Sequence, residues 1–410
     1  MGTYVIGAAY TALGRHYDLS VPALTALAVE AALEDAGITV AELEGAVYAN
    51  TRQGVMEGQH GIRGHVALRP LGIQGVPIIN TDNACASSGF AFAQARALVE
   101  SGAMDVVLVA GTEKMWYPDS DERVYAAFMG SMDVSAQEDN EATIRKMLAS
   151  TIPPAGADDA MGSVFMGVYA AYAREYMHRY GTTVEQMASV ASKAFDYGAL
   201  NPRAQRKRRR TVEEVLTDRL VVWPLTRSMC APVSDGSAAL ILCSDRALER
   251  FDRGRAVRVA ASAMASGTDR DRADFDRAAA RLAGDRAYSQ AGISPDQVNV
   301  AEVHDAVAFG EIMQAENLRL FPRGEAGLAA ERGETGIGGS LPINTSGGLL
   351  AKGHPTAATG AAQICDIVEQ LRGEAGTRQV PGARVGLTEC GGGFYGVEDA
   401  AVSVNLFVGP

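Results

Sequence analysis

Cysteine is scarce in this 410-residue chain and irregularly placed. The five cysteines, at positions 85, 230, 243, 365 and 390, are odd in number and lack the short repeated spacing of a disulfide framework or a zinc knuckle. His60 and His65 in "HGIRGH" are also poorly spaced for a shared metal. We therefore expect no metal site, and a reducing, cytoplasmic compartment.

Long apolar runs and an excess of basic residues are also missing. No stretch of about 18 strongly apolar residues is present, and the N-terminal "MGTYVIGAAYTALG" lacks the basic region of a secretory signal. Asp and Glu number 49 against 37 Lys and Arg, giving a net charge of -12. These features predict a protein with no membrane span and no nucleic-acid partner.

Two parts of the chain instead contain similar segments, rich in small residues, in the same order. A helix is predicted over "VPALTALAVEAALEDAG", with Ser20 as N-cap, Pro22 in the first turn and Gly37 at the stop. The Ala-Gly-Ile stop recurs at 291–293, again before an acidic spacer and a strand. "AQARALVESGAMDVVLVAG" and "AAQICDIVEQLRGEAG" likewise predict helices that feed apolar strands. This order predicts a duplicated α/β fold, with coincidence among Ala-rich helices as the alternative.

Residues 116–222 interrupt the repeat. They contain the polar, turn-rich segments "YPDSDERVYAAF", "SAQEDNEATIRK" and "IPPAGADD", and two helices are predicted around "GVYAAYAREYMHRYG" and "TVEQMASVASKAF". We interpret 116–222 as an inserted loop domain that covers a binding site. The rest of the chain divides into an N-terminal half, 1–115 with 223–250, and a C-terminal half, 251–410.

Cys85 in "NTDNACASSGF" stands at the start of the predicted apolar helix 86–101. The free N–H groups and positive dipole end of a helix N-terminus favour a thiolate, which is the nucleophilic form of cysteine. A buried, inert structural cysteine is the alternative.

Three further segments place reactive side chains at strand ends or helix starts. His354, before Pro355 in "NTSGGLLAKGHPTAATGAA", could accept a proton or donate to an oxyanion, or could be a turn histidine without a role. Cys390 ends an apolar strand in "LTECGGGFYG", where the glycines could expose backbone N–H groups or form a bulge or turn. His304, in "AEVHDAVAF", could polarise a carbonyl, and Asp305 could be a helix N-cap.

The chain places a candidate nucleophile in the first half and its candidate partners in the second. This order resembles that of the thiolase superfamily, and within it the sterol-carrier and lipid-transfer type. The resemblance covers essentially the whole chain and includes the cysteine helix, "GTEKM", "SDGSAALIL" at 234–242, the Gly-His-Pro segment and the terminal Cys-Gly-Gly. His304-Asp305 stands where common thiolases have Asn-Glu, which favours the lipid-transfer type. The resemblance implies a five-layered α-β-α-β-α thiolase fold with an inserted loop domain.

The resemblance also implies an acyl-CoA acyltransferase. Cys85 would form an acyl-enzyme, His354 would activate it, and Cys390 would exchange a proton with the α-carbon of a second acyl-CoA. Backbone N–H groups of Cys85 and Gly392 would form an oxyanion hole. Coenzyme A would be substrate and product, with no tightly bound cofactor. The basic run "RKRRR" could contact the phosphates of coenzyme A, although such a run is also typical of a solvated helix cap. The predicted CoA-binding residues are Arg206 and Arg208 in this run, and Ser234.

Departures from the common pattern leave alternatives open. Ala358 replaces a more usual glycine, and the segment after Cys390 is unusual. The alternatives are a retro-aldolase or carbon-acylating enzyme with a small OB-fold partner, a decarboxylating ketosynthase that uses two histidines, and a catalytically silent scaffold. The resemblance further implies a homodimer or homotetramer paired through an edge strand. No fused lipid-carrier domain is expected after Pro410.

Overall fold

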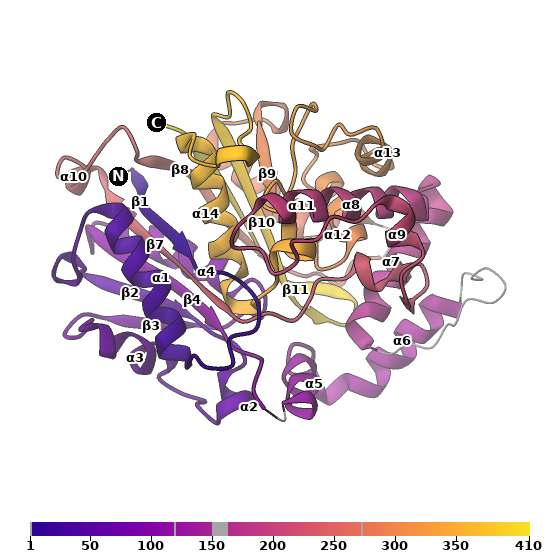
Figure 1. The fold of residues 1–410 in the computed structure, drawn as a ribbon, viewed down its shortest axis with the longest axis horizontal. Helices are drawn as coiled ribbons and strands as arrows, with labels where there is room; N and C mark the ends of the chain where they lie inside the picture. Colours follow the sequence, from indigo (N-terminus) through magenta and orange to yellow (C-terminus); the bar gives the residue numbers. More distant parts are fainter. Residues whose placement is uncertain (1, 119, 150–162, 272–273) are drawn as a thin grey trace.

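A computed structural model describes residues 2–118, 120–149, 163–271 and 274–410 (Figure 1). Nine strands follow one hydrogen-bonded order, β3-β2-β4-β7-β1-β8-β11-β10-β9. Their bounds are β1 (Thr3–Tyr10), β2 (Gly45–Ala49), β3 (Ile78–Thr81), β4 (Val106–Glu113), β7 (Gly236–Ser244), β8 (Val257–Ser266), β9 (Val300–Glu302), β10 (Val385–Tyr395) and β11 (Glu398–Val408). The short strands β5 (Leu220–Val222) and β6 (Leu225–Thr226) pair separately.

Strand pairing repeats between the two halves. In the N-terminal half, β1 and β4 flank β7 as antiparallel neighbours, and β2 is parallel to β4. In the C-terminal half, β8 and β10 flank β11 in the same antiparallel sense, and β9 is parallel to β10. The halves join where Tyr4 and Val5 of β1 pair with Arg258 and Val257 of β8. The predicted duplicated α/β architecture is therefore confirmed.

Helices cover the outer faces of both half-sheets and fill the space between them. The bounds are α1 (Val21–Ala36), α2 (Gln53–Glu57), α3 (Arg63–Leu68), α4 (Ser87–Glu100), α10 (Asp245–Leu248), α11 (Ala279–Ala291), α12 (Ala308–Asn317), α13 (Ala326–Glu331) and α14 (Thr359–Arg372). α1 packs on the N-terminal half-sheet and α11 on the C-terminal one, whereas α4 and α14 contact strands of both. Separate apolar clusters fill these interfaces, which gives the predicted five layers.

Local signals explain where the matching outer helices begin and end. Ser20 Oγ accepts a hydrogen bond from the backbone N–H of Ala23 at the start of α1. Gly37 and Gly292 end α1 and α11 with φ angles of 67° and 64°, in the left-handed region that favours glycine. The recurring Ala-Gly-Ile stop thus has the same conformation in both halves.

The segment 116–222 is mainly helical where the structure describes it. It contains α5 (Asp121–Met129), α6 (Gln137–Ala149), α7 (Val164–Tyr180), α8 (Val184–Leu200) and α9 (Val212–Leu216). α7 and α8 confirm the two predicted helices, whereas "IPPAGADD" lies outside the described residues. In Figure 1, α7, α8 and α9 lie beside the C-terminal half, with which they share an apolar cluster, whereas α5 lies beside α2.

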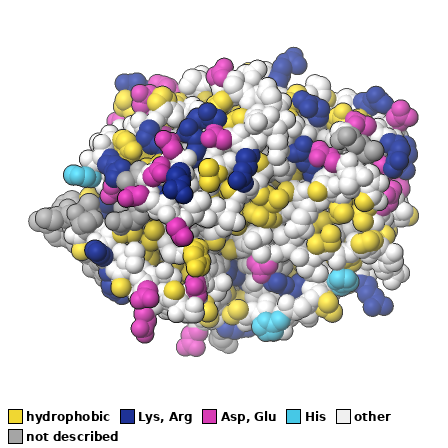
Figure 2. All heavy atoms as spheres, turned by 180° about the vertical axis from the view of Figure 1, so that it is seen from behind, with side chains coloured by type: hydrophobic (Ala, Val, Ile, Leu, Met, Phe, Trp, Pro, Cys, Tyr) yellow, Lys and Arg dark blue, Asp and Glu magenta, His cyan; other side chains and the backbone are white. Residues whose placement is uncertain are grey.

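The distribution of surface charge and the polarity of the helices bear on the expected absence of a nucleic-acid partner and of a membrane span. Basic and acidic side chains are interspersed among the described residues on the face shown in Figure 2. Within the described part of the chain, no helix combines the length and apolar character needed to cross a bilayer.

The central helices α4 and α14 meet through small residues. A Cβ atom at Gly360 would lie 2.9 Å from the backbone nitrogen of Gly89. Ser88 Oγ accepts a 2.9 Å hydrogen bond from the N–H of Ala361 across the same contact. Because Ser88 and Gly89 follow Cys85 closely in sequence, this contact links the cysteine helix to the helix that follows His354.

We expect Gly360→Val to lower the free energy of unfolding by about 1–3 kcal/mol, because the added side chain must separate two closely packed backbones. Urea unfolding followed by circular dichroism measures the change. Gly61→Val is the control, since a Cβ there meets no atom within 4 Å and its φ is not left-handed. Equal losses in both variants would contradict the close-packing argument.

Candidate active site

Cys85 lies in a tight turn directly before α4. Ala84 has a φ of 50°, a left-handed conformation that is uncommon for a residue other than glycine. The N–H of Ala86 donates to the carbonyl of Asn83, and that of Ser87 donates to the carbonyl of Ala84, each at 3.1 Å. This turn sets Cys85 at the N-terminal end of α4, among the lining residues of a cavity.

Two histidines from the C-terminal half lie beside Cys85. The Cys85 sulfur and ring nitrogens of His304 and His354 all lie within 4.8 Å of one another, and the two ring centroids are 5.2 Å apart. His304 follows β9, and His354 precedes α14. Sulfur and imidazole donors can bind zinc, but they are equally the groups of a cysteine nucleophile with an adjacent base.

Hydrogen bonding defines the tautomer of His354. Its Nδ1 is 2.7 Å from Thr359 Oγ1, and that hydroxyl donates its own hydrogen to the carbonyl of Pro355 at 3.1 Å. With its hydrogen in that bond, the hydroxyl accepts from the ring, so we assign the His354 proton to Nδ1. Nε2 keeps a free lone pair, which is the form that can take a proton from a thiol.

Burial keeps this group uncharged at neutral pH. It raises the pKa of the Cys85 thiol to about 11, although the Arg52 charge acts in the opposite direction. It lowers the pKa of His304 to about 4, and burial together with His304 and Arg52 holds the pKa of His354 well below its usual value. The free site is a neutral thiol beside two neutral imidazoles.

Cys390 lies on β10, next to the turn that carries Cys85. Its Sγ is 3.2 Å from the backbone carbonyl oxygen of Cys85, and burial raises the pKa of its thiol well above the usual value. The cavity lining, within the described residues, does not include Cys390. The predicted strand end at this residue was wrong, since β10 continues to Tyr395 and pairs with β11 on both sides of Gly393.

The glycines after Cys390 allow β10 to touch the Cys85 turn. A Cβ on Gly392 would lie 2.3 Å from the carbonyl oxygen of Asn83 and 2.4 Å from the nitrogen of Ala86, so no side chain fits. Gly392 pairs with Ala401 of β11 and lines the cavity. The glycine sequence thus continues the strand at a close backbone approach, with an irregularity at Gly393, whose φ is 64° and which has no partner in the β11 register.

Asp305 does not cap a helix, contrary to the alternative considered from the sequence. Val307 is the N-cap residue of α12, and Asp305 Oδ1 accepts a 2.7 Å hydrogen bond from the N–H of Leu349. This bond ties the segment after β9 to the glycine-rich segment before His354. Asp305 therefore helps to hold the two histidine-bearing segments together.

Sequence reasoning missed two buried acids near the cysteines. Burial raises the pKa of Glu389 to about 8 and that of Asp399 to about 7. Glu389 precedes Cys390 and accepts a hydrogen bond from the N–H of His304, whereas Asp399 lines the cavity. Glu389 could have been noticed in the sequence, because it is a single acidic residue next to a cysteine in a predicted apolar strand.

The cavity has a volume of about 280 Å³ and mostly apolar walls. The inserted segment supplies much of the wall, including Phe128, Phe165 and Tyr169. The charged or titratable groups among its lining residues are few: Arg52, Cys85, Tyr125, Tyr169, Cys230, His304, His354 and Asp399. Sequence reasoning missed Arg52, which stands three residues beyond the end of β2.

The three predicted CoA-binding residues lie elsewhere. Arg206 donates to the backbone carbonyls of Cys230 and Leu350, and Arg208 is an exposed partner of Glu214. Ser234 Oγ accepts a hydrogen bond from the N–H of His354. Among the described residues that line the cavity, none of the three is included. Arg206 and Ser234 contact the segment that carries His354, and CoA binding by the three residues stays a prediction.

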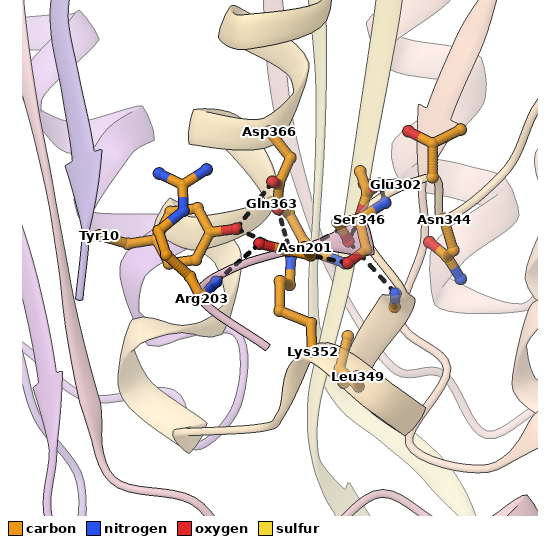
Figure 3. Close-up of polar contacts among 12 residues, drawn as sticks. Tyr10, Asn201, Arg203, Glu302, Asn344, Ser346, Leu349, Lys352, Gln363 and Asp366 are labelled. Atoms are coloured by element: carbon orange, nitrogen blue, oxygen red, sulfur yellow. Dashed lines mark hydrogen bonds and ion pairs between the residues drawn. The ribbon is translucent and has the colours of Figure 1, made fainter. Parts of the chain in front are cut away.

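A buried ion-pair network holds the glycine-rich segment against α14 (Figure 3). Lys352 Nζ lies 2.5 Å from Asp366 and 3.6 Å from Glu302, and Tyr10 donates to Asp366 at 2.9 Å. Burial alone would lower the pKa of Lys352, but the two carboxylates raise it. The network thereby fixes the backbone two residues before His354.

A duplicated α/β fold with a cysteine at the head of its central helix defines the thiolase class of fold. The family models "Thiolase, N-terminal domain" and "Thiolase C-terminal domain-like" match residues 3–212 and 261–404. The chain belongs to the thiolase family and is a thiolase-type acyltransferase.

Curated relatives agree with this assignment. The chain is 38% identical over 404 residues to the acetyl-CoA acetyltransferase of Methanothermobacter thermautotrophicus, covering 98% of each. It is 34% identical to sterol carrier protein 2 of Bos taurus, covering 89% of this chain and 65% of that protein. The benzoylsuccinyl-CoA thiolase subunit BbsB of Thauera aromatica is 30% identical, with 95% and 94% covered.

Solved structures share the fold. The Ltp2-ChsH2(DUF35) aldolase matches with a TM-score of 0.79 at 24% identity, covering 100% of this chain and 98% of that one. The Acat5 thiolase from Ascaris suum in complex with coenzyme A matches with a TM-score of 0.68 at 18% identity, covering 100% of both chains.

The neutral state of Cys85 predicts slow alkylation that accelerates with pH. Below the pKa of about 11, the thiolate fraction rises about tenfold per pH unit, and iodoacetamide labelling of Cys85 should follow it between pH 7 and 10. Peptide mapping separates Cys85 from Cys230, and Cys85→Ser removes the signal. A rate that is already constant at pH 7 would instead indicate a thiolate–imidazolium pair.

We expect Lys352→Met to lower the free energy of unfolding by about 3–5 kcal/mol, because two buried carboxylates lose their shared cation. Urea unfolding at pH 7 measures the loss. Arg246→Met is the control, since Arg246 pairs with Asp105 at the surface, where water screens the ion pair and its contribution to stability is small. Similar losses in the two variants would contradict the proposal that the buried network contributes more to stability than a surface ion pair.

Proposed function

We propose that the protein transfers acyl groups between coenzyme A thioesters through an acyl-Cys85 intermediate, forming or cleaving a carbon–carbon bond. The observation that carries this proposal is the meeting of Cys85, His304 and His354 beside one cavity. A nucleophile with an adjacent base is the arrangement that covalent acyl transfer needs.

In the first half-reaction, His354 Nε2 takes the thiol proton as Cys85 Sγ attacks the thioester carbonyl. The bond between that carbonyl and the CoA sulfur then breaks, and His354 returns the proton to the departing CoA thiolate. Since both groups are neutral in the free site, proton transfer accompanies attack. Backbone N–H groups of Cys85 and Gly392 are the proposed donors to the carbonyl oxygen, which becomes negative as the bond forms.

In the second half-reaction, the Cys390 thiol gives its proton to the neutral His354 imidazole, and the resulting thiolate removes a proton from the α-carbon of a second acyl-CoA. The carbanion attacks the acyl-Cys85 carbonyl, a carbon–carbon bond forms, and the Cys85 thiolate leaves and takes the proton back from His354. Thiolysis runs the same steps backwards. The 3.2 Å contact between Cys390 Sγ and the Cys85 carbonyl supports this role, because it sets the second sulfur next to the nucleophile. Arg206, Arg208 and Ser234 remain the proposed CoA-binding residues.

A second candidate is a retro-aldolase or carbon-acylating enzyme that works with a small OB-fold partner. The fold likeness to an aldolase that is named with a second component, ChsH2(DUF35), favours keeping it. This chemistry requires no acyl-cysteine, so the fate of Cys85 separates the two candidates.

Assembly through an edge strand belongs to the same proposal. β3 ends the nine-strand order, and its residues Ile79 and Asn80 are exposed. An unpaired edge of this kind invites pairing with a second copy. We infer a homodimer or homotetramer, and the five free cysteines support a reducing, cytoplasmic compartment.

The acyl-enzyme is tested by incubating the protein with acetyl-CoA and measuring the intact mass. We expect one acetyl adduct that is absent in Cys85→Ser and forms about 10²–10⁴-fold more slowly in His354→Ala, which lacks the base. Cys390→Ala should keep the adduct and lose carbon–carbon bond formation.

Cys230→Ala is the matched control, because Cys230 also lines the cavity but has no part in the proposed steps. Its adduct and its activity should equal those of the wild type. Absence of an adduct with any short acyl-CoA would favour the aldolase or a silent scaffold. Unchanged carbon–carbon chemistry in Cys390→Ala would reject the two-cysteine mechanism.

A further inference from the structure

Arg52 is a buried cation whose hydrogen-bonding capacity is only partly used. Its side chain is 3% exposed and lines the cavity together with Cys85 and His354. Nη1 donates to the backbone carbonyl of Ala127, whereas Nε and Nη2 are buried with no hydrogen-bond partner in the described structure. Burying charged donors without hydrogen-bond partners costs free energy, so an acceptor that bound Nε and Nη2 would be stabilised there.

The neighbouring acid Glu113 does not supply that acceptor. Its carboxylate accepts hydrogen bonds from the backbone N–H of Arg52 and from the Thr51 and Thr356 hydroxyls, with further donors around it. No ion pair joins it to the Arg52 guanidinium within the described residues. Glu113 therefore fixes the Arg52 backbone and leaves the side chain to meet another group.

The only other charged side chain among the described lining residues is Asp399, whose pKa is raised to about 7 by burial. Arg52 thus contributes the one strongly basic group to an otherwise largely apolar cavity. The pKa values of both Cys85 and His354 are influenced by the Arg52 charge, which places the guanidinium close to the reacting groups.

The position of Arg52 beside Cys85 limits which anionic group of a substrate can reach its guanidinium. The phosphates of coenzyme A are separated from the thioester carbon by the long pantetheine arm, so they lie far from Cys85 when that carbon is attacked. A carboxylate on the acyl group, a few bonds beyond the thioester, would instead enter the same cavity. Arg52 and Phe128 line this cavity together, with the Phe128 ring 5.1 Å from the guanidinium carbon.

We propose that Arg52 selects acyl-CoA substrates whose acyl chain carries a carboxylate, which forms a two-point hydrogen-bonded ion pair with Nε and Nη2. This inference rests on the acyl transfer at Cys85 proposed above and names its substrate class. Guanidinium and carboxylate match in geometry, and the pair is strengthened by the low polarity of the cavity.

Arg123 provides a matched control inside the same region. Like Arg52, it donates Nη1 to a backbone carbonyl, that of Met56, and its guanidinium lies near an aromatic ring, that of Tyr117. It is not among the described residues that line the cavity. Replacing Arg123 therefore tests the loss of such structural contacts without loss of the cavity cation.

The experiment compares length-matched pairs: succinyl-CoA with pentanoyl-CoA, and adipyl-CoA with heptanoyl-CoA. Rates of Cys85 acylation are measured by intact mass, and dissociation constants are measured by calorimetry in a Cys85→Ala background. For at least one pair we expect the carboxylated member to be preferred about tenfold to hundredfold in the wild type. Arg52→Met should abolish that preference, so that the ratio between the two members of a pair falls to about one. Arg123→Met should keep the preference.

Each outcome decides a separate question. Acylation of Cys85 without any preference for a carboxylate, or equal slowing of both pair members in Arg52→Met, overturns the role of Arg52 and leaves acyl transfer intact. A binding preference that depends on Arg52, without any acylation, supports the carboxylate site and rejects the acyl-enzyme. Arg52→Lys, which keeps the charge but not the two-point geometry, should retain part of the preference even if Arg52→Met folds poorly.

Discussion

Backbone-to-backbone packing between the two halves determines where the reactive groups lie. Helices α4 and α14 approach so closely that Gly360 has no room for a side chain beside Gly89. On the other side of the cysteine turn, β10 comes equally close at Gly392. Cys85 is therefore held between two elements of the C-terminal half, and the thiol and the imidazoles cannot move apart without separating packed main chain. The chemistry depends on this constraint, because a nucleophile and its base must stay within hydrogen-bonding reach.

The same close packing removes water and thereby sets the charges in the site. Burial favours the neutral forms of the Cys85 thiol and the two imidazoles, and it raises the pKa values of the two nearby acids to about 8 for Glu389 and about 7 for Asp399. Arg52 and the Lys352 network are the exceptions, and they differ in kind. Lys352 is fully paired with acids and serves to hold the His354 segment, whereas Arg52 retains unpaired donors at the cavity. An unpaired cation is a feature of recognition rather than of folding.

The sequence allowed the duplication and the outer helices to be predicted, because these depend on local signals, and it pointed to the cysteines and histidines proposed to react. Caps and left-handed glycines define α1 and α11, and a cysteine at a helix start is visible in a few residues. The path of β10 through three glycines could not be predicted, since glycine usually weakens a strand and only the distant Cys85 turn explains it. The Lys352 network joins Tyr10, Glu302 and Asp366, so no local pattern reveals it. Arg52 could have been suspected, because it follows the carboxyl end of a parallel strand, where α/β sheets bind ligands.

The architecture separates the chemistry of the site from the choice of substrate. Cys85, His304, His354 and Cys390 come from the two repeated halves, and main-chain packing fixes their positions. A substantial part of the cavity wall comes from the inserted segment, including Phe128, Phe165 and Tyr169. Arg52 connects the two parts, since it belongs to the N-terminal half and donates to a carbonyl of α5 in the insert. A change in α5 would therefore alter which acyl groups meet the guanidinium while the distance between the thiol and its base stays the same.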